Sequence, residues 1–306
     1  MNATFSVIGA PSSAGAHMPG QERGPQALRE AGLLQRLNER FDRVRDLGDL
    51  ATVRHRPDKS RRRHQNSDRV LEVARSLAEL IETAADDGGR LLVMGGDCTI
   101  SLGVVSGLLR RSDILGIIYL DAHGDLNTPP TSVSGAMDSM GMAHLLAEAG
   151  TVAEIARMGP RYPLMQPKDV LFFGFEPEEM NPVEHETFER RGLGGYTAAE
   201  VRADPVKTAR SARSALEARC GSFLVHFDVD VLDFVDCPLA NIPTINRGLE
   251  LGQVLSSLEV FAASPGFAGL VITELNPGHA DEAGETLRKF VNGICDALAA
   301  EPQPSQ

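Results

Sequence analysis

The sequence predicts an α/β fold in which helices cover both faces of a mostly parallel β-sheet. Short apolar runs alternate with segments of helical periodicity from one end of the chain to the other. No internal repeat and no long linker interrupts this alternation. Polar residues follow directly after several of the apolar runs, where open parallel sheets bind their ligands. We therefore expect one domain over residues 1–306.

The expected elements follow in chain order. Strands are predicted at residues 5–9, 44–47, 91–94, 115–120, 170–173, 222–227 and 269–273. Helical periodicity is clear at residues 68–85, 205–219, 251–262 and 286–299. The basic stretch 54–64 lies between elements and lacks aromatic residues, so we expect a solvated loop rather than a basic recognition patch.

Composition excludes several classes of protein. The chain has 306 residues, of which 42% are apolar and 24% charged, which is typical of a soluble globular protein. A formal net charge of −12 argues against a general nucleic-acid surface. No run of about 18 apolar residues predicts a membrane helix, and the N-terminus does not resemble a signal peptide. Four cysteines are scattered along the chain, and for Cys220, Cys237 and Cys295 we expect free thiols in a reducing cytoplasm.

Two strand ends carry closely spaced acidic residues. The stretch "YLDAHGDLNTP" places Asp121, His123 and Asp125 on one side of a strand end, because side chains alternate along a strand. The stretch "VHFDVDVLD" adds Asp228 and Asp230. Carboxylates in such numbers need a countercharge, and mixed carboxylate and imidazole ligands suit Mn²⁺, Fe²⁺ or Zn²⁺. Two bridged ions would activate a water for attack on an electrophilic carbon.

Together these motifs resemble one family. The succession GGDC, DAHGDLNTP, HFDVDVLD and ELNP is similar to that of the ureohydrolase superfamily, which includes arginases, agmatinases and formiminoglutamases. The stretch "GQERGPQALREAGL" resembles the early loop and first helix of that family. The resemblance covers nearly the whole chain. It implies a three-layer α/β/α fold with a mostly parallel sheet of about eight strands.

The resemblance also implies an activity. It is the hydrolysis of a guanidino C–N bond of arginine or a modified arginine, with a metal-bridging hydroxide as nucleophile. Two Mn²⁺ ions are the implied cofactors, with one site weak or occupied by Zn²⁺ or Fe²⁺. The implied assembly is a homo-oligomer, a trimer or a hexamer, in the cytoplasm, with no nucleic-acid or membrane partner.

Site residues can be carried over position by position. The residues Asp121, His123, Asp125, Asp228 and Asp230 match metal ligands, with Asp121 and Asp228 bridging both ions. Glu274 matches the glutamate that binds the substrate guanidinium. The substrate carboxylate would contact Asn127, Ser132 and Ser134. For the α-ammonium group Glu178, Glu179 and Glu184 are available, and we favour Glu179. The implied catalytic residues are Asp125, Asp138 and Glu274.

Two positions depart from the family, as does the segment "DFVDCPLANIP" from Asp233 onward. Cys98 stands where most members have a metal-binding histidine. It is a thiolate ligand that favours a softer metal, a poor ligand that leaves the site weak, or a small buried residue. We favour metal contact, because the backbone places the side chain at the site. Asp138 stands where arginases have a proton-shuttling histidine, and His226 would support the ligands from the same side as Asp228.

These departures leave alternative functions open. Some relatives that cleave N-hydroxyarginine also have cysteine at the position of Cys98, so N-hydroxyarginine or another guanidino acid is an alternative substrate. A formimino compound fits less well, because Glu274 suits a guanidinium. A non-catalytic binding protein with a degraded metal site is the alternative of a different class.

Overall fold

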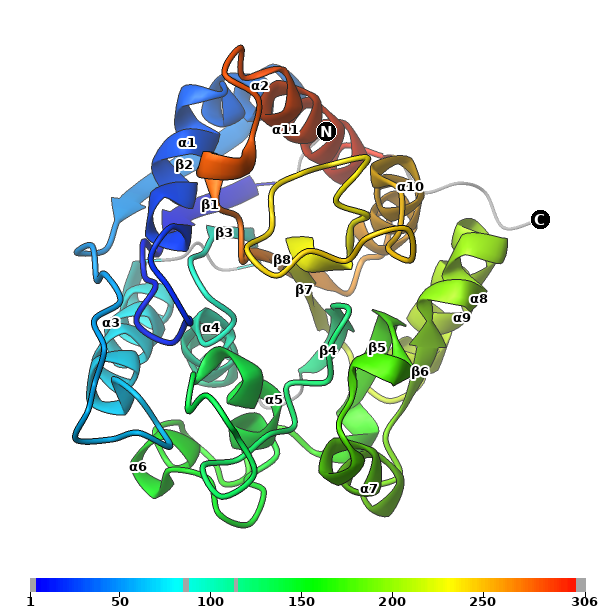
Figure 1. The fold of residues 1–306 in the computed structure, drawn as a ribbon. Helices are drawn as coiled ribbons and strands as arrows, with labels where there is room; N and C mark the ends of the chain where they lie inside the picture. The colour runs from blue at the N-terminus through cyan, green and yellow to red at the C-terminus, as the bar shows by residue number, and fades with distance from the viewer. Residues whose placement is uncertain (1–3, 85–87, 113–114, 301–306) are drawn as a thin grey trace.

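Eight strands form one sheet, in the order β2-β1-β3-β8-β7-β4-β5-β6. The structure is a computed structural model and describes residues 4–84, 88–112 and 115–300 (Figure 1). The strands are β1 (Thr4–Gly9), β2 (Arg43–Asp49), β3 (Arg90–Met94), β4 (Gly116–Leu120), β5 (Val170–Phe175), β6 (Gly194–Thr197), β7 (Phe223–Asp228) and β8 (Phe267–Thr273). Every described pair is parallel. Because β3 lies between β1 and β8, strands from both ends of the chain join one sheet. The single domain over residues 1–306 stays a prediction.

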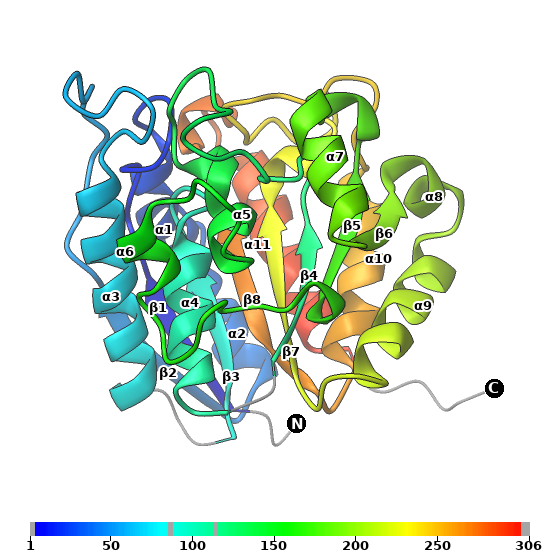
Figure 2. The same cartoon turned by 90° about the horizontal axis from the view of Figure 1, so that it is seen from below.

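Helices cover both faces of this sheet, so the chain forms three layers (Figures 1 and 2). One face carries α1 (Gly24–Glu30), α2 (Leu33–Arg40), α8 (Ala198–Ala203), α9 (Pro205–Glu217), α10 (Leu251–Ala262) and α11 (Glu285–Leu298). The other carries α3 (Ser67–Ala84), α4 (Ile100–Leu109), α5 (Gly141–Leu145), α6 (Ala153–Ala156) and α7 (Pro182–Arg190). Two apolar clusters, one on each side of the sheet, hold the layers together. The predicted fold class is confirmed.

Short 3₁₀ turns complete the chain. They are η1 (Gln21–Arg23), η2 (Asp138–Met140), η3 (Pro167–Asp169), η4 (Pro177–Glu179), η5 (Val229–Val231) and η6 (Pro277–His279). Within the described residues, no helix combines the length and the apolar character that a membrane crossing requires.

Seven of the strands match the sequence-based prediction with small differences at their ends, and β6 was missed. Its sequence, GGYT, contains two glycines, which are rare in strands. A Cβ on Gly195 would lie 2.3 Å from the carbonyl oxygen of Phe172 in β5. This close pairing at the sheet edge, rather than local propensity, makes the segment a strand. The predicted helices correspond to α3, α9, α10 and α11, although residue 85 lies outside the described residues.

The sheet register brings four strand ends together. Leu120 of β4 pairs with Phe227 of β7, and Phe227 pairs with Ile272 of β8. Ile272 in turn pairs with Met94 of β3. These four residues form one row across neighbouring strands, and Figure 2 shows the strands side by side. Because all four strands run in the same direction, the residues that follow the row leave the sheet at one edge.

The basic stretch 54–64 is a loop between β2 and α3, as expected, and it also contacts a second loop. Arg63 Nη1 donates a hydrogen bond to the Pro130 carbonyl at 2.9 Å. Just beyond the stretch, Gln65 Nε2 donates to the Ser134 carbonyl at 2.9 Å. These contacts fix the loop that contains the predicted carboxylate-binding serines.

The loop after β1 passes so close to the end of β3 that glycine is required there. The backbone N–H of Asp97 donates to the Ser12 carbonyl at 2.9 Å. A Cβ added to Gly96 would lie 1.6 Å from that carbonyl oxygen. Since no side chain fits at this distance, the second glycine of the GGDC motif is needed for the two loops to pack.

We expect Gly96→Ala to lower the free energy of unfolding by about 1–3 kcal/mol or more, because the added methyl group overpacks the two loops. Gly252→Ala in α10 is the control, since its Cβ meets nothing within 4 Å and alanine favours a helix. Denaturant unfolding measures both variants. Equal stability of Gly96→Ala and the wild type would contradict the close approach.

Candidate metal centre

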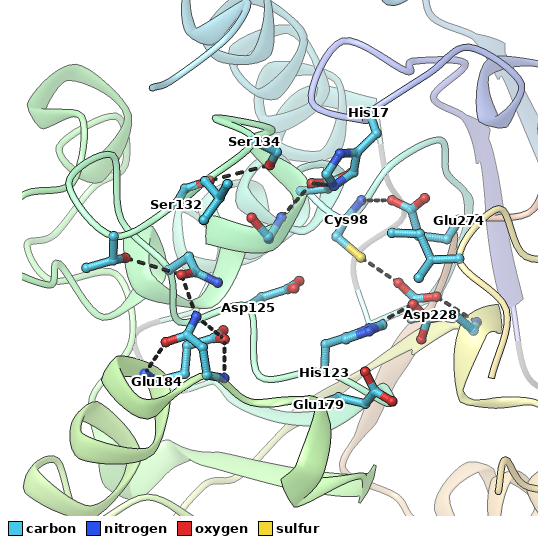
Figure 3. Close-up of a pocket in the computed structure, with 18 residues that line it drawn as sticks. His17, Cys98, His123, Asp125, Ser132, Ser134, Glu179, Glu184, Asp228 and Glu274 are labelled. Carbon is cyan, nitrogen blue, oxygen red and sulfur yellow. Dashed lines mark hydrogen bonds and ion pairs between the residues drawn. The ribbon is translucent and has the colours of Figure 1, made fainter. Parts of the chain in front are cut away.

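A cavity of about 430 Å³ opens at the edge of the sheet where the four strands end. In Figure 3, Cys98 and Asp228 lie on one side of it, and Ser132, Ser134 and Glu184 lie on the other. Its acidic lining residues are Asp125, Asp138, Glu179, Glu184, Asp228, Asp230 and Glu274. None of the described lining residues is lysine or arginine. The cavity therefore favours a cation.

The two acidic motifs fold into the same local turn. Asp121 follows β4, and its Oδ1 accepts the backbone N–H of His123 at 2.6 Å. Asp228 ends β7, and its Oδ1 accepts the backbone N–H of Asp230 at 2.7 Å. Aspartate favours such turns, because its short side chain reaches the backbone two residues later. Each turn leaves one carboxylate oxygen for another partner.

Two groups of donor atoms form at this edge and share Asp121. The first consists of Cys98, Asp121, His226 and Asp228, and the second of Asp121, His123 and Asp230. Within each group the donor atoms lie within 4.8 Å of one another. The structure thus brings together five of the six predicted metal ligands, namely Cys98, Asp121, His123, Asp228 and Asp230. It adds His226, for which the sequence predicted only a supporting role.

The electrostatics of both groups fit a divalent cation. Burial, with the charges of Asp230 and Asp121, raises the pKa of Asp228 well above its ordinary value. Burial opposes the ionisation of Asp121, but the nearby imidazoles of His123 and His226 lower its pKa. Asp121 Oδ2 is buried and accepts no hydrogen bond. A cation would supply both the missing positive charge and a partner for this oxygen.

Asp125, the sixth predicted ligand, belongs to neither donor group among the described residues. It lines the same cavity, and its Oδ2 accepts a hydrogen bond from the Tyr119 hydroxyl at 2.5 Å. Burial and the charge of Asp121 raise the pKa of Asp125 well above its ordinary value. The backbone φ of Asp125 is 50°, in the left-handed region that aspartate tolerates better than most residues. Its role as a ligand stays a prediction.

Cys98 forms hydrogen bonds with Asp228 of the first group and with the neighbouring Glu274. Its backbone N–H donates to Glu274 Oε1 at 2.9 Å. Its thiol donates to Asp228 Oδ2 at 2.7 Å. Burial and the charge of Asp228 raise the pKa of the thiol well above its ordinary value. The cysteine therefore points at the carboxylates, as the favoured interpretation of the sequence requires.

Glu274 is held at the cavity from two directions. Gln21 Nε2 donates to its Oε2 at 2.8 Å, and the Cys98 N–H donates to its Oε1. Its φ of 61° is unusual for glutamate and marks a constrained position. The role of Gln21 was missed, although it lies in the GQERG stretch on which the family resemblance partly rests.

The predicted carboxylate-binding residues lie together on the far side of the cavity. Ser132 Oγ accepts the N–H of Gly135 at 2.9 Å, and Ser134 Oγ accepts the N–H of Ala136 at 3.2 Å. The two Oγ atoms lie 3.5 Å apart, a separation at which each hydroxyl can still turn its proton to another acceptor. Asn127 lines the same part of the cavity.

Asn127 presents its amide nitrogen rather than its oxygen. Its Oδ1 accepts hydrogen bonds from Asn181 Nδ2 at 2.9 Å and from the Thr131 hydroxyl at 3.2 Å. The Nδ2 group therefore keeps two protons to donate.

Two of the three candidate ammonium-binding glutamates line the cavity. Glu179 forms a close ion pair with Arg247 and stays partly exposed. Glu184 is buried in the capping box of α7, where it accepts the N–H groups of Asn181 and Leu126. Glu178 is exposed and is not among the described lining residues. Glu179 therefore has the freer carboxylate at the mouth of the cavity.

Asp138 faces a histidine that the sequence analysis did not single out. His17 Nε2 lies 3.8 Å from Asp138 Oδ1, and both residues line the cavity. Burial, together with the charge of Asp97, raises the pKa of Asp138 to about 8. His17 lies in the loop after β1, more than a hundred positions from Asp138 in the sequence, so no local spacing connects the two.

Comparisons with known proteins agree with this geometry. A model of the arginase family matches residues 3–299. Human arginase-1 is 31% identical over 301 residues, which cover 97% of this chain and 92% of that protein. A crystal structure of arginase from Bacillus subtilis has a TM-score of 0.85 at 27% identity, covering 97% of this chain and 99% of that one.

A structure of lower sequence identity has a similar fold. The formimidoylglutamase of Bacillus subtilis has a TM-score of 0.74 at 18% identity and covers 99% of this chain and 89% of that one. This likeness concerns the fold alone. With the match of the family model over nearly its whole length, the chain belongs to the arginase family.

Proposed function

We propose that this protein is a metal-dependent amidinohydrolase that cleaves a guanidino C–N bond of arginine or of a modified arginine. One observation carries the proposal: two acidic donor groups share Asp121 at the edge of a cavity that also contains Glu274. Membership of the arginase family supports it. The trimeric or hexameric assembly and the cytoplasmic location stay predictions.

The two donor groups suit two divalent cations, with Mn²⁺ the ion implied by the sequence resemblance. When bound, such ions supply an activated water as the nucleophile. Asp125 can orient this water, because the Tyr119 hydroxyl occupies only its Oδ2 and leaves Oδ1 free. The remaining tasks fall to side chains that bind the two ends of the substrate.

Glu274 binds the guanidinium end. Its carboxylate is fixed by Gln21 and by the Cys98 N–H, so it needs no reorganisation when a planar cation arrives. Each oxygen keeps a further lone pair for a guanidinium N–H. The absence of lysine and arginine from the described lining leaves this end without a competing cation.

The amino-acid end of the substrate meets neutral donors. The hydroxyls of Ser132 and Ser134 and the amide of Asn127 each keep a proton for the substrate carboxylate. Glu179 is the nearby acid for the α-ammonium group, in competition with Arg247. An amino acid with a cationic side chain therefore matches both ends of the cavity.

Hydrolysis forms a bond from the water oxygen to the guanidino carbon and breaks the bond from that carbon to the leaving nitrogen. The leaving amine must gain a proton as it departs. Asp138, with a pKa of about 8, still holds a proton at neutral pH and can donate it. A carboxylic acid of this strength can replace the histidine of the relatives.

A substrate panel tests the proposal. We expect Mn²⁺-loaded protein to release product from arginine or N-hydroxyarginine faster than from agmatine, guanidinobutyrate or formiminoglutamate, because only the first two offer both an amino-acid end and a guanidino group. Asp121→Asn, which weakens both donor groups, should abolish turnover. No turnover of any member by protein with confirmed bound metal would favour a binding protein, and unchanged turnover by Asp121→Asn would reject the site.

Glu274→Gln removes the negative charge that faces the guanidinium. We expect kcat/KM to fall about 10- to 100-fold, because a hydrogen bond to a charged group contributes about 1.5–3 kcal/mol. Steady-state kinetics on the best substrate of the panel measure the loss. Glu178→Gln is the matched control and should behave as the wild type. A similar loss in both variants would mean that the effect is general rather than specific to Glu274.

The pH profile tests Asp138. An acid with a pKa of about 8 donates only while it is protonated, so we expect kcat to fall as the pH rises through about 8. Asp138→Asn cannot donate in this way and should lower kcat by about 10²- to 10⁴-fold. The variant should also lose this limb of the profile. Asp169→Asn, a buried aspartate outside the described cavity lining, is the control. A limb that persists in Asp138→Asn would assign it to another group.

A further inference from the structure

His226 brings an imidazole nitrogen into the first donor group from the strand β7 itself. The side chain is fully buried. Its Nε2 lies 3.6 Å from Cys98 Sγ and 3.6 Å from Asp121 Oδ2. The Thr273 hydroxyl, at 3.5 Å, is its other polar neighbour. All these distances exceed that of a strong hydrogen bond, so Nε2 faces a space between donors rather than one close partner.

The ring of His226 is fixed in this orientation by the rest of its surroundings. Its Nδ1 lies 2.6 Å from Ser101 Oγ. Its face stacks on the Tyr119 ring at 4.0 Å, with an angle of 2° between the planes. Histidines that bind metals usually have their other ring nitrogen held in this way, which fixes the tautomer and the direction of the free lone pair.

The other three donors of this group are equally buried and face the same space. Cys98 Sγ lies 2.7 Å from Asp228 Oδ2. Asp121 Oδ2 is the oxygen that accepts no hydrogen bond. The group thus brings together one sulfur, one nitrogen and two carboxylates, and each of the four residues is at most 3% exposed. A four-donor set of this composition is typical of zinc and of other cations that accept thiolate.

The second donor group differs in number and in exposure. It has three residues, Asp121, His123 and Asp230. The His123 side chain is 26% exposed, whereas Cys98 and Asp228 of the first group also line the cavity but are buried. Sites with three protein donors leave a position for water or substrate, whereas four-donor sites are closed.

We propose that Cys98, Asp121, His226 and Asp228 form a closed thiolate–imidazole–carboxylate site for a zinc-type cation, next to an open three-donor site that faces the substrate. His226 is then a ligand from β7, and Cys98 is a thiolate ligand rather than a small buried residue. The thiol proton leaves to solvent as the cation binds. The inference deepens the proposed function, on which it rests for the role of the open site.

The wild-type protein provides the first test. Metal-free protein is loaded with one equivalent of Zn²⁺, and X-ray absorption measures the ligand distances. We expect one sulfur at about 2.3 Å together with nitrogen and oxygen at about 2.0–2.2 Å. The same protein loaded with Co²⁺ should show a sulfur-to-cobalt charge-transfer band. A shell of nitrogen and oxygen alone, with no such band, would overturn the proposal.

Variants then separate the two new ligands. We expect Cys98→Ser to lose the sulfur shell and the charge-transfer band. His226→Gln should keep the sulfur signal and lower Zn²⁺ affinity at least about 10- to 100-fold, the loss that follows removal of a ligand's hydrogen-bond partner. Cys295→Ser and His144→Gln are the matched controls, since both residues are buried outside the cavity lining. Wild-type Zn²⁺ affinity in folded His226→Gln would exclude His226 as a ligand.

These readouts do not depend on turnover. A sulfur shell in a protein that hydrolyses no member of the substrate panel would uphold the closed site and reject the proposed function. Turnover without a sulfur shell would uphold the function and reject the closed site. The two proposals can therefore fail separately.

Discussion

The repulsion between carboxylates buried at the centre of the sheet edge is the constraint on which the rest of this site depends. The register of β3, β8, β7 and β4 places four strand ends in one row, so their acidic residues meet whatever their distance in sequence. Burial and the charges of Asp230 and Asp121 oppose the ionisation of Asp228, and a bound cation would offset this cost. The fold can accommodate these buried carboxylates because the strand ends that bring them together also bring together the donor atoms of a cation site.

A second buried carboxylate organises the loops around this centre. Asp97 accepts the N–H groups of Gly15 and Thr99, which ties the loop after β1 to the loop after β3. The Gly15 carbonyl in turn accepts the N–H groups of Met137 and Asp138. Three segments that are distant in sequence are thus joined through the Asp97 carboxylate and the Gly15 backbone. Glycine at position 96 is part of the same arrangement, because it allows the loops to touch.

The cavity has two sides of different composition. Cys98 and Asp228 lie on the side of the donor groups, whereas the hydroxyls of Ser132 and Ser134 lie on the opposite side together with Glu184. The basic loop contributes to this opposite side without entering it, since Arg63 and Gln65 donate to backbone carbonyls of the serine loop. Their hydrogen bonds position the serines, while the charge of Arg63 stays outside the lining. The proposed recognition of an amino acid with a cationic side chain therefore depends on loops as well as on strand ends.

The sequence alone determined the fold class, most strands and the acidic residues that follow two of them, because these depend on local periodicity. It did not reveal β6, whose glycines suit a strand only beside β5, or His17 and Gln21. Gln21 and Glu274 are 253 positions apart, and no spacing in the chain relates them. His226 illustrates the difference: the alternation along β7 placed it on the side of Asp228, but only packing against Cys98, Tyr119 and Ser101 turned its nitrogen toward the carboxylates. Local interactions fix which residues leave a strand together, and the tertiary structure decides which atoms from different strands meet.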